Sequence, residues 1–154
     1  MAFQKIKSFA KINLALNVLG KLSNTHKIES LVAFIDLNDL IYIKKINLDK
    51  HQIKFYGKFS YGIKKKNTIS NLLKILDDRQ ILKDQKFEIR IKKNIPSKAG
   101  LGGGSMNAAT ILKYFIDKKI IKITRKQLLA ITNFIGSDVI LGINTSNTIL
   151  SSNN

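Results

Sequence analysis

The sequence contains no cysteine, and its two histidines, His26 and His51, lie far apart in the chain. The absence of cysteine excludes disulfides, thiolate catalysis and cysteine-based zinc sites, and two isolated histidines do not make a histidine-rich metal cluster. We therefore predict no metal site built from the protein's own side chains. A cysteine-free chain is typical of a reducing compartment.

Long apolar runs are missing as well. No stretch approaches the ~18 apolar residues that a membrane-spanning helix needs. The segment Ile12–Gly20 follows Lys5 and Lys7, but Asn13 and Asn17 interrupt it and no small-x-small cleavage site follows. These absences predict a cytoplasmic protein with neither a signal peptide nor a membrane span. The length of 154 residues, with 44% hydrophobic and 24% charged residues, is typical of one globular domain.

Acidic residues are scarce, with 10 Asp and Glu against 27 Lys and Arg, which gives a net charge of +17. Such a charge attracts anions, so nucleic acid, an anionic membrane and phosphorylated metabolites are all admissible partners. A bias toward the A/T-rich codons of lysine, isoleucine and asparagine is an equally good explanation, because the lysines are scattered through the chain. The run Lys64–Lys66 is predicted to be a solvated turn.

The first half of the chain has the composition of β-strands. Phe87, Ile89 and Ile91 alternate with polar residues and predict a strand over 87–92. The β-branched and aromatic segments 40–46 and 52–56 predict two more strands. Together with helices in the second half, these strands predict an α+β fold in which helices cover one side of a sheet.

Three helices are predicted from their start signals. The first is capped by Asn67 or Thr68, the second begins at Ser105, and the third opens with a capping box at Thr124 and ends at Gly136. Beyond Asp138 the chain becomes rich in Asn, Ser and Thr, so no further core element is expected, and residues 151–154 are predicted to be a polar tail.

Glycine is concentrated between the strand over 87–92 and the second helix, in the segment 95–105. Glycines at a helix start allow backbone N–H groups and the positive end of the helix dipole to approach a phosphate. Gly104 is followed by Ser105 and Met106, so the segment is not a Walker A loop, and a G-x-G-x-x-G motif from Gly100 fails at Ser105. A different phosphate-binding loop is therefore predicted. A flexible surface turn is the structural alternative, but glycines at a helix start would be destabilising without a use.

Three segments in sequence order carry a resemblance to a known family. The segment Pro96–Ala109 resembles the phosphate-binding motif of the GHMP small-molecule kinases. The segments Ala10–Leu14 and Gly136–Val139 are similar to two further motifs of that family. The glycine cluster resembles the same segment in one branch of the family. That branch phosphorylates a cytidyl-diphospho sugar alcohol in non-mevalonate (MEP pathway) isoprenoid synthesis. The resemblance implies the ribosomal protein S5 domain 2-like fold of the GHMP kinase N-terminal domain.

The resemblance also implies the roles of particular residues in an ATP- and Mg²⁺-dependent kinase. Lys11 would lie between the attacking hydroxyl and the γ-phosphate, and Asp138 would accept or orient the hydroxyl proton while holding Lys11. Asn13 and His26 would face the cytidyl substrate. The phosphates of ATP would be bound by the loop residues Pro96, Ser97, Lys98, Ala99, Gly100, Leu101, Gly102, Gly103, Gly104, Ser105 and Met106.

Each of these residues has a structural alternative. Lys11 could be a surface charge at a strand end, Asp138 could cap a helix, and His26 could be an exposed loop histidine. Thr25 and Met106 stand where the family usually has an aromatic residue and a serine. His51 is expected to be structural.

The resemblance covers residues 1–150, which are expected to form the ATP-binding, catalytic N-terminal domain, without the C-terminal domain that the family carries. Two other functions remain open from the sequence. One is a GHMP kinase for a mevalonate- or homoserine-type alcohol, and the other is a basic RNA-binding module on the S5-like fold. The combination of Lys11, the glycine-rich helix start and Asp138 favours a kinase over an RNA-binding module, and makes nucleic acid an unexpected partner.

Overall fold

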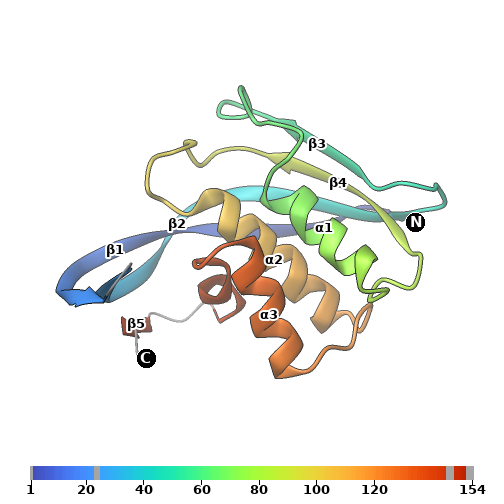
Figure 1. The fold of residues 1–154 in the computed structure, drawn as a ribbon. Helices are drawn as coiled ribbons and strands as arrows, with labels where there is room; N and C mark the ends of the chain where they lie inside the picture. Colours follow the sequence, from blue (N-terminus) through green and yellow to red (C-terminus); the bar gives the residue numbers. More distant parts are fainter. Residues whose placement is uncertain (1, 23–24, 145–147, 152–154) are drawn as a thin grey trace.

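A five-stranded mixed sheet forms one layer of the protein, and three helices form the other (Figure 1). The computed structural model describes residues 2–22, 25–144 and 148–151, with side-chain environments for residues 2–15 and 30–144. Strands β1 (Gln4–Leu22) and β2 (Thr25–Ile46) are antiparallel and very long. Strand β4 (Lys86–Lys92) lies antiparallel to β2, and β3 (Gln52–Tyr56) lies parallel to β4.

The helices cover only one face of this sheet, as predicted. They are α1 (Thr68–Asp78), α2 (Gly103–Asp117) and α3 (Arg125–Ile135). Alternate residues of β4 and β2 point into the core beneath the helices, among them Ile41, Ile89 and Ile91, which are fully buried. Of the β4 residues with the opposite parity, Arg90 and Lys92 are exposed, whereas Glu88 is covered by its ion pairs with Lys44 and Arg90. The alternating pattern of β4 therefore reflects a sheet that helices cover on one face.

The predicted helix boundaries agree closely with the structure, except at α2. Asn67 caps α1 in a reciprocal capping box with Ser70, and Thr124 caps α3 in another with Gln127. Helix α2 begins at Gly103, two residues before the predicted start at Ser105. Glycine has a low helix propensity, so propensity alone predicts a helix that begins after the glycine cluster.

The long hairpin of β1 and β2 was not predicted beyond residues 40–46. Register shifts fall between Phe9 and Ala10, between Asn13 and Ala15, and between Val18 and Gly20. The first of these shifts changes which residues face the core, since the adjacent Ala10 and Lys11 are both buried, so the strand has no constant alternation to be read from the sequence.

The expectation that no core element follows Asp138 is wrong. Residues Val139–Ile143 form a short 3₁₀ helix, η1, and Val139 and Leu141 are buried. Strand β5 (Thr148–Ser151) then pairs with β2. Contacts with α2 hold the short apolar segment of η1, which is too brief to show a periodic signal of its own. No helix in the described part of the chain is both long and apolar enough to cross a membrane.

His51 has the structural role that was expected. Its Nδ1 accepts a hydrogen bond from the N–H of Phe87 at 3.0 Å, and its Nε2 lies 3.3 Å from Asp77 Oδ2. The ring also stacks on Phe87. Burial lowers the pKa of His51 below its ordinary value and outweighs the opposing effect of Asp77.

Because the folded protein favours neutral His51, its contribution to stability is fully present above the unfolded pKa of ~6.5 and is lost as the pH falls below that value. We therefore expect the free energy of unfolding in urea to drop more between pH 7.5 and pH 5 for the wild type than for His51→Gln. The other titrating groups, including His26, are common to both proteins. Equal drops would show that His51 does not link folding to pH.

Candidate functional site

The glycine-rich segment forms a loop that ends in an uncapped helix N-terminus. Gly102 is the N-cap of α2 and has a left-handed backbone with φ of +67°, which strongly favours glycine. Among the described residues, no side chain caps this helix end. The first N–H groups of a helix have no partner within it, and the helix dipole adds positive potential there. The loop therefore presents donors that suit an anion.

A pocket of about 340 Å³ opens beside this loop. One wall is the loop itself, from Pro96 to Ser105, and side chains from other elements complete the pocket. These additional lining residues are Phe55, Ile63, Asn67, Thr68, Ile69, Lys93 and Asn107. The pocket thus combines apolar walls with a few polar groups, as small-molecule sites do.

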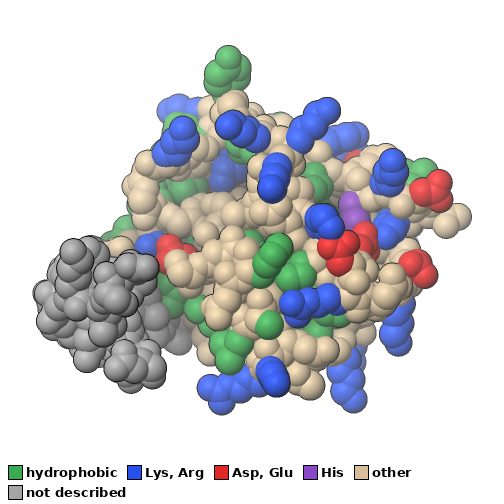
Figure 2. Space-filling view, viewed as in Figure 1, with side chains coloured by type: hydrophobic (Ala, Val, Ile, Leu, Met, Phe, Trp, Pro, Cys, Tyr) green, Lys and Arg blue, Asp and Glu red, His purple; other side chains and the backbone are tan. Residues whose placement is uncertain are grey.

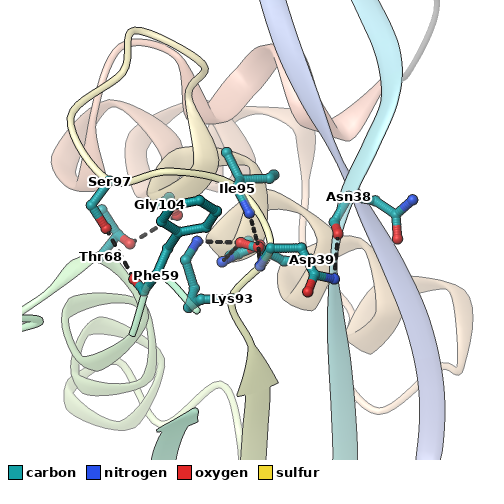
Figure 3. A network of polar contacts seen from close by, with 10 residues as sticks. Asn38, Asp39, Phe59, Thr68, Lys93, Ile95, Ser97 and Gly104 are labelled. Atoms are coloured by element: carbon teal, nitrogen blue, oxygen red, sulfur yellow. Dashed lines mark hydrogen bonds and ion pairs between the residues drawn. The ribbon is translucent and has the colours of Figure 1, made fainter. Parts of the chain in front are cut away.

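Hydrogen bonds fasten the loop to three other parts of the fold. The N–H of Lys11 on β1 donates to Leu101 O at 3.0 Å. The hydroxyl of Thr68, at the start of α1, donates to Gly104 O at 2.8 Å, and that of Ser97 donates to Phe59 O at 3.3 Å (Figure 3). The loop is therefore held at several points along its length.

Lys11 and Asp138, which are 127 positions apart in sequence, meet next to the loop. Lys11 Nζ lies 3.2 Å from Asp138 Oδ2 and donates to Asn13 Oδ1 at 3.2 Å. Lys11 is 6% exposed, so it is not a surface charge at a strand end. Asp138 occupies the N-cap position of η1, but its side chain makes no capping hydrogen bond and pairs with Lys11 instead.

The ion pair and the loop are in direct contact. A Cβ placed on Gly102 would lie 2.8 Å from Lys11 Cγ, closer than two such atoms can approach. The Lys11 side chain therefore passes immediately beside the N-cap of α2. A buried ammonium, a partly exposed carboxylate and the N-terminus of a helix converge at one place, which is an arrangement suited to positioning and stabilising an anion.

One of the other predicted site residues lies away from the pocket. Met106 does not line the pocket, because its buried side chain packs with Val32 and Leu141. The side chain of His26 lies outside the described residues. Asn13 is exposed and stays beside Lys11, where it can face a ligand.

The structure adds three polar residues that the sequence analysis did not select. Asp39, Lys93 and Asn107 are buried together beneath the loop (Figure 3 shows the first two). A sequence signal exists for one of them, because Asn107 lies between Met106 and Ala108 on the buried side of a helix. Buried polar groups need partners, so such positions point to a network.

Charge elsewhere on the molecule is spread out. Figure 2 shows Lys and Arg side chains scattered over the visible face rather than gathered into one patch. Lys64, Lys65 and Lys66 form an exposed turn before α1, as predicted. Within the described ranges, no group of three or more His, Cys, Asp or Glu side chains could hold a metal ion.

The fold and the loop together define an α+β domain with a glycine-rich helix N-terminus suited to anions. Comparison with known proteins is consistent with this class. The model of the GHMP kinases N terminal domain matches residues 66–151, which is more than half of the chain. The chain therefore belongs to the GHMP kinase family.

Two curated relatives illustrate the similarity. The 4-diphosphocytidyl-2-C-methyl-D-erythritol kinase of Pelagibacter ubique (strain HTCC1062) is 60% identical over 149 residues, covering 97% of this chain and 53% of the relative. The kinase of the same name from Clostridioides difficile (strain 630) is 35% identical over 140 residues, covering 90% of this chain and 47% of the relative. The chain spans about half the length of these relatives.

Solved structures show the same fold. A crystal structure of 4-(cytidine 5'-diphospho)-2C-methyl-D-erythritol kinase matches with a TM-score of 0.76 and 24% identity, covering 97% of this chain and 52% of that one. The phosphomevalonate kinase of Streptococcus pneumoniae matches with a TM-score of 0.64 and 14% identity, covering 99% of this chain and 49% of that one. These matches confirm the S5-like α+β fold.

Proposed function

We propose that residues 1–150 form the ATP-binding, catalytic domain of a kinase that phosphorylates the 2-hydroxyl of 4-diphosphocytidyl-2-C-methyl-D-erythritol. The observation that carries the proposal is the contact between the Lys11–Asp138 pair and the N-cap of α2. The identity to the Pelagibacter kinase supports this substrate among the alcohols that the family phosphorylates.

In the proposed reaction, the loop binds the phosphates of ATP through its backbone N–H groups. Asp138 accepts the proton of the substrate hydroxyl while that oxygen bonds to the γ-phosphorus and the bond from phosphorus to the bridging oxygen of ADP breaks. Lys11 stabilises the negative charge of the transferred phosphoryl group. Asn13, beside Lys11, and His26 are proposed to contact the cytidyl substrate.

Magnesium is part of this proposal as the usual partner of ATP. Mg²⁺ is held in such sites by one or two protein oxygens together with the phosphates, and it neutralises charge on them. The Ser105 hydroxyl, on the first turn of α2, is an oxygen ligand of the right type beside the loop. An all-protein metal cage is not required for this chemistry.

A chimera tests the proposal. The C-terminal half of the Pelagibacter kinase, joined after residue 150, gives a protein of the length of the relatives. We expect it to form ADP from ATP when the cytidyl alcohol is present, and not with mevalonate, phosphomevalonate or homoserine. The isolated 154-residue chain is expected to bind ATP weakly and to show no turnover, because its pocket is open to water.

The control is the Pelagibacter kinase itself, assayed in parallel. Turnover by the chimera with a different alcohol would replace the proposed substrate. A folded chimera that consumes ATP with none of these alcohols would overturn the proposed kinase activity.

A further inference from the structure

Asp39 lies at the centre of a buried network under the glycine-rich loop (Figure 3). It is fully buried near the middle of β2, and its carboxylate accepts four hydrogen bonds. Two of them come from the backbone N–H groups of Asn94 and Ile95, at 2.7 and 2.9 Å. A third comes from Asn107 Nδ2 at 2.8 Å, and the fourth comes from the ammonium of Lys93, which forms an ion pair with Asp39.

These donors stand on both sides of the phosphate loop. Asn94 and Ile95 immediately precede Pro96, where the loop begins, and Asn107 is on the first turns of α2, where the loop ends. One carboxylate therefore ties the entry of the loop to the helix that follows it. The distance and angle between these two ends determine where the N–H groups of the loop point.

The ammonium group of Lys93, which is the positive charge of this network, lies directly beside the loop. A Cβ on Gly103 would lie 3.3 Å from Lys93 Nζ and 3.1 Å from Ile95 Cγ2, so the first residue of α2 rests directly on these two side chains. Lys93 is 4% exposed and also lines the pocket. An unpaired ammonium would be unfavourable at this depth, and Asp39 supplies its counter-charge.

We propose that Asp39 is a positioning residue for the nucleotide site, acting through Asn107, Lys93 and the 94–95 backbone to hold the phosphate loop in its binding geometry. Asp39 does not line the pocket, so it acts on a ligand only through these groups. The proposal rests on the proposed function in that the ligand of the loop is taken to be ATP.

Two variants weaken the network from different sides. Asp39→Asn keeps the shape and an oxygen for the 94–95 backbone, but it turns an NH₂ group toward the donors of Lys93 and Asn107. Asn107→Ala removes the tie to α2 and also a polar side chain from the pocket lining. Binding of a fluorescent ATP analogue is expected to weaken ~10-fold or more for Asp39→Asn and several-fold for Asn107→Ala, since small displacements of binding groups have large effects.

The double variant Asp39→Asn with Asn107→Asp exchanges the two side chains, so the pair again has one amide and one carboxylate. We expect it to restore the wild-type rate of amide exchange at 94–95 and in the first turn of α2, since the hydrogen bond is re-formed in the opposite direction. Exchange is the measurement for this variant because Asn107 lines the pocket, where a carboxylate repels phosphate. Ile43→Val, a mild change in the buried core on the same strand, is the matched control. It is expected to leave the affinity of the folded protein unchanged, although it lowers stability.

Hydrogen exchange separates this proposal from the proposed function, because it needs no nucleotide. In the ligand-free Asp39→Asn protein, amides at 94–95 and in the first turn of α2 are expected to exchange faster, and those of α3 at the wild-type rate. Wild-type exchange around the loop together with wild-type affinity in both folded single variants would overturn the role of Asp39. Faster loop exchange in a protein that fails to bind ATP even as wild type would support the role of Asp39 and overturn the proposed nucleotide.

Discussion

Replacing Lys11 by alanine in the active chimera is expected to lower kcat by at least ~10², the usual scale for a group that acts on the transition state. Lys11 is buried and has two acceptors, Asp138 and Asn13, so its ammonium is fixed in place beside the loop. A fixed charge stabilises developing charge without the reorganisation that a mobile side chain requires. Asp138→Asn removes the proton acceptor and is expected to have a comparable effect.

The measurement is steady-state kinetics with both substrates, combined with ATP binding in the absence of the alcohol. ATP affinity is expected to change less than kcat, because both residues are assigned to the chemical step. Lys5→Ala is the matched control, since Lys5 is exposed on the same strand and should leave kcat unchanged. A rise confined to the KM for the alcohol would mean that Lys11 and Asp138 only bind substrate.

Gly102→Ala is expected to lower the affinity for ATP by at least ~10-fold. A Cβ at this position opposes the left-handed backbone, which costs about 1–2 kcal/mol, and it collides with Lys11 Cγ at 2.8 Å. Relief of the collision moves either the N-cap of α2 or the Lys11 side chain. Both movements disturb the place where the loop and the ion pair meet.

Gly62→Ala provides the control for backbone strain. Gly62 has a φ of +77°, but a Cβ there would meet nothing within 4 Å, and the residue does not line the pocket. Both variants should therefore lose similar stability from the backbone term in urea unfolding, while only Gly102→Ala loses nucleotide affinity. Equal ATP affinity of the two folded variants would contradict the importance of this contact.

Gly103 is less suitable than Gly102 for testing the approach of a phosphate. A Cβ at this residue would crowd Ile95 and Lys93 beneath the loop. A valine at Gly103 would therefore disturb the buried network as well as the approach of a phosphate. Gly102 and Asp39 separate these two effects, because one lies beside Lys11 and the other lies at the centre of the network.

Local signals in the sequence determined much of this protein. The alternation of Phe87, Ile89 and Ile91 determined a strand with one covered face, because side chains of a strand alternate between its two faces. The capping boxes at Asn67 and Thr124 determined where two helices begin, because side-chain oxygens there satisfy free N–H groups. The glycine cluster indicated a phosphate loop, because its backbone can approach a ligand closely.

Only the tertiary structure decided how these pieces meet. The pairing of Lys11 with Asp138 depends on where β1 and η1 lie relative to α2, which no local pattern encodes. Bulges in β1 remove the alternation that would have shown which side chains are buried, and η1 is held by packing rather than by its own propensity. The role of Asp39 arises in the same way, because one buried carboxylate collects donors from segments more than fifty residues away, and such contacts form only when the chain folds.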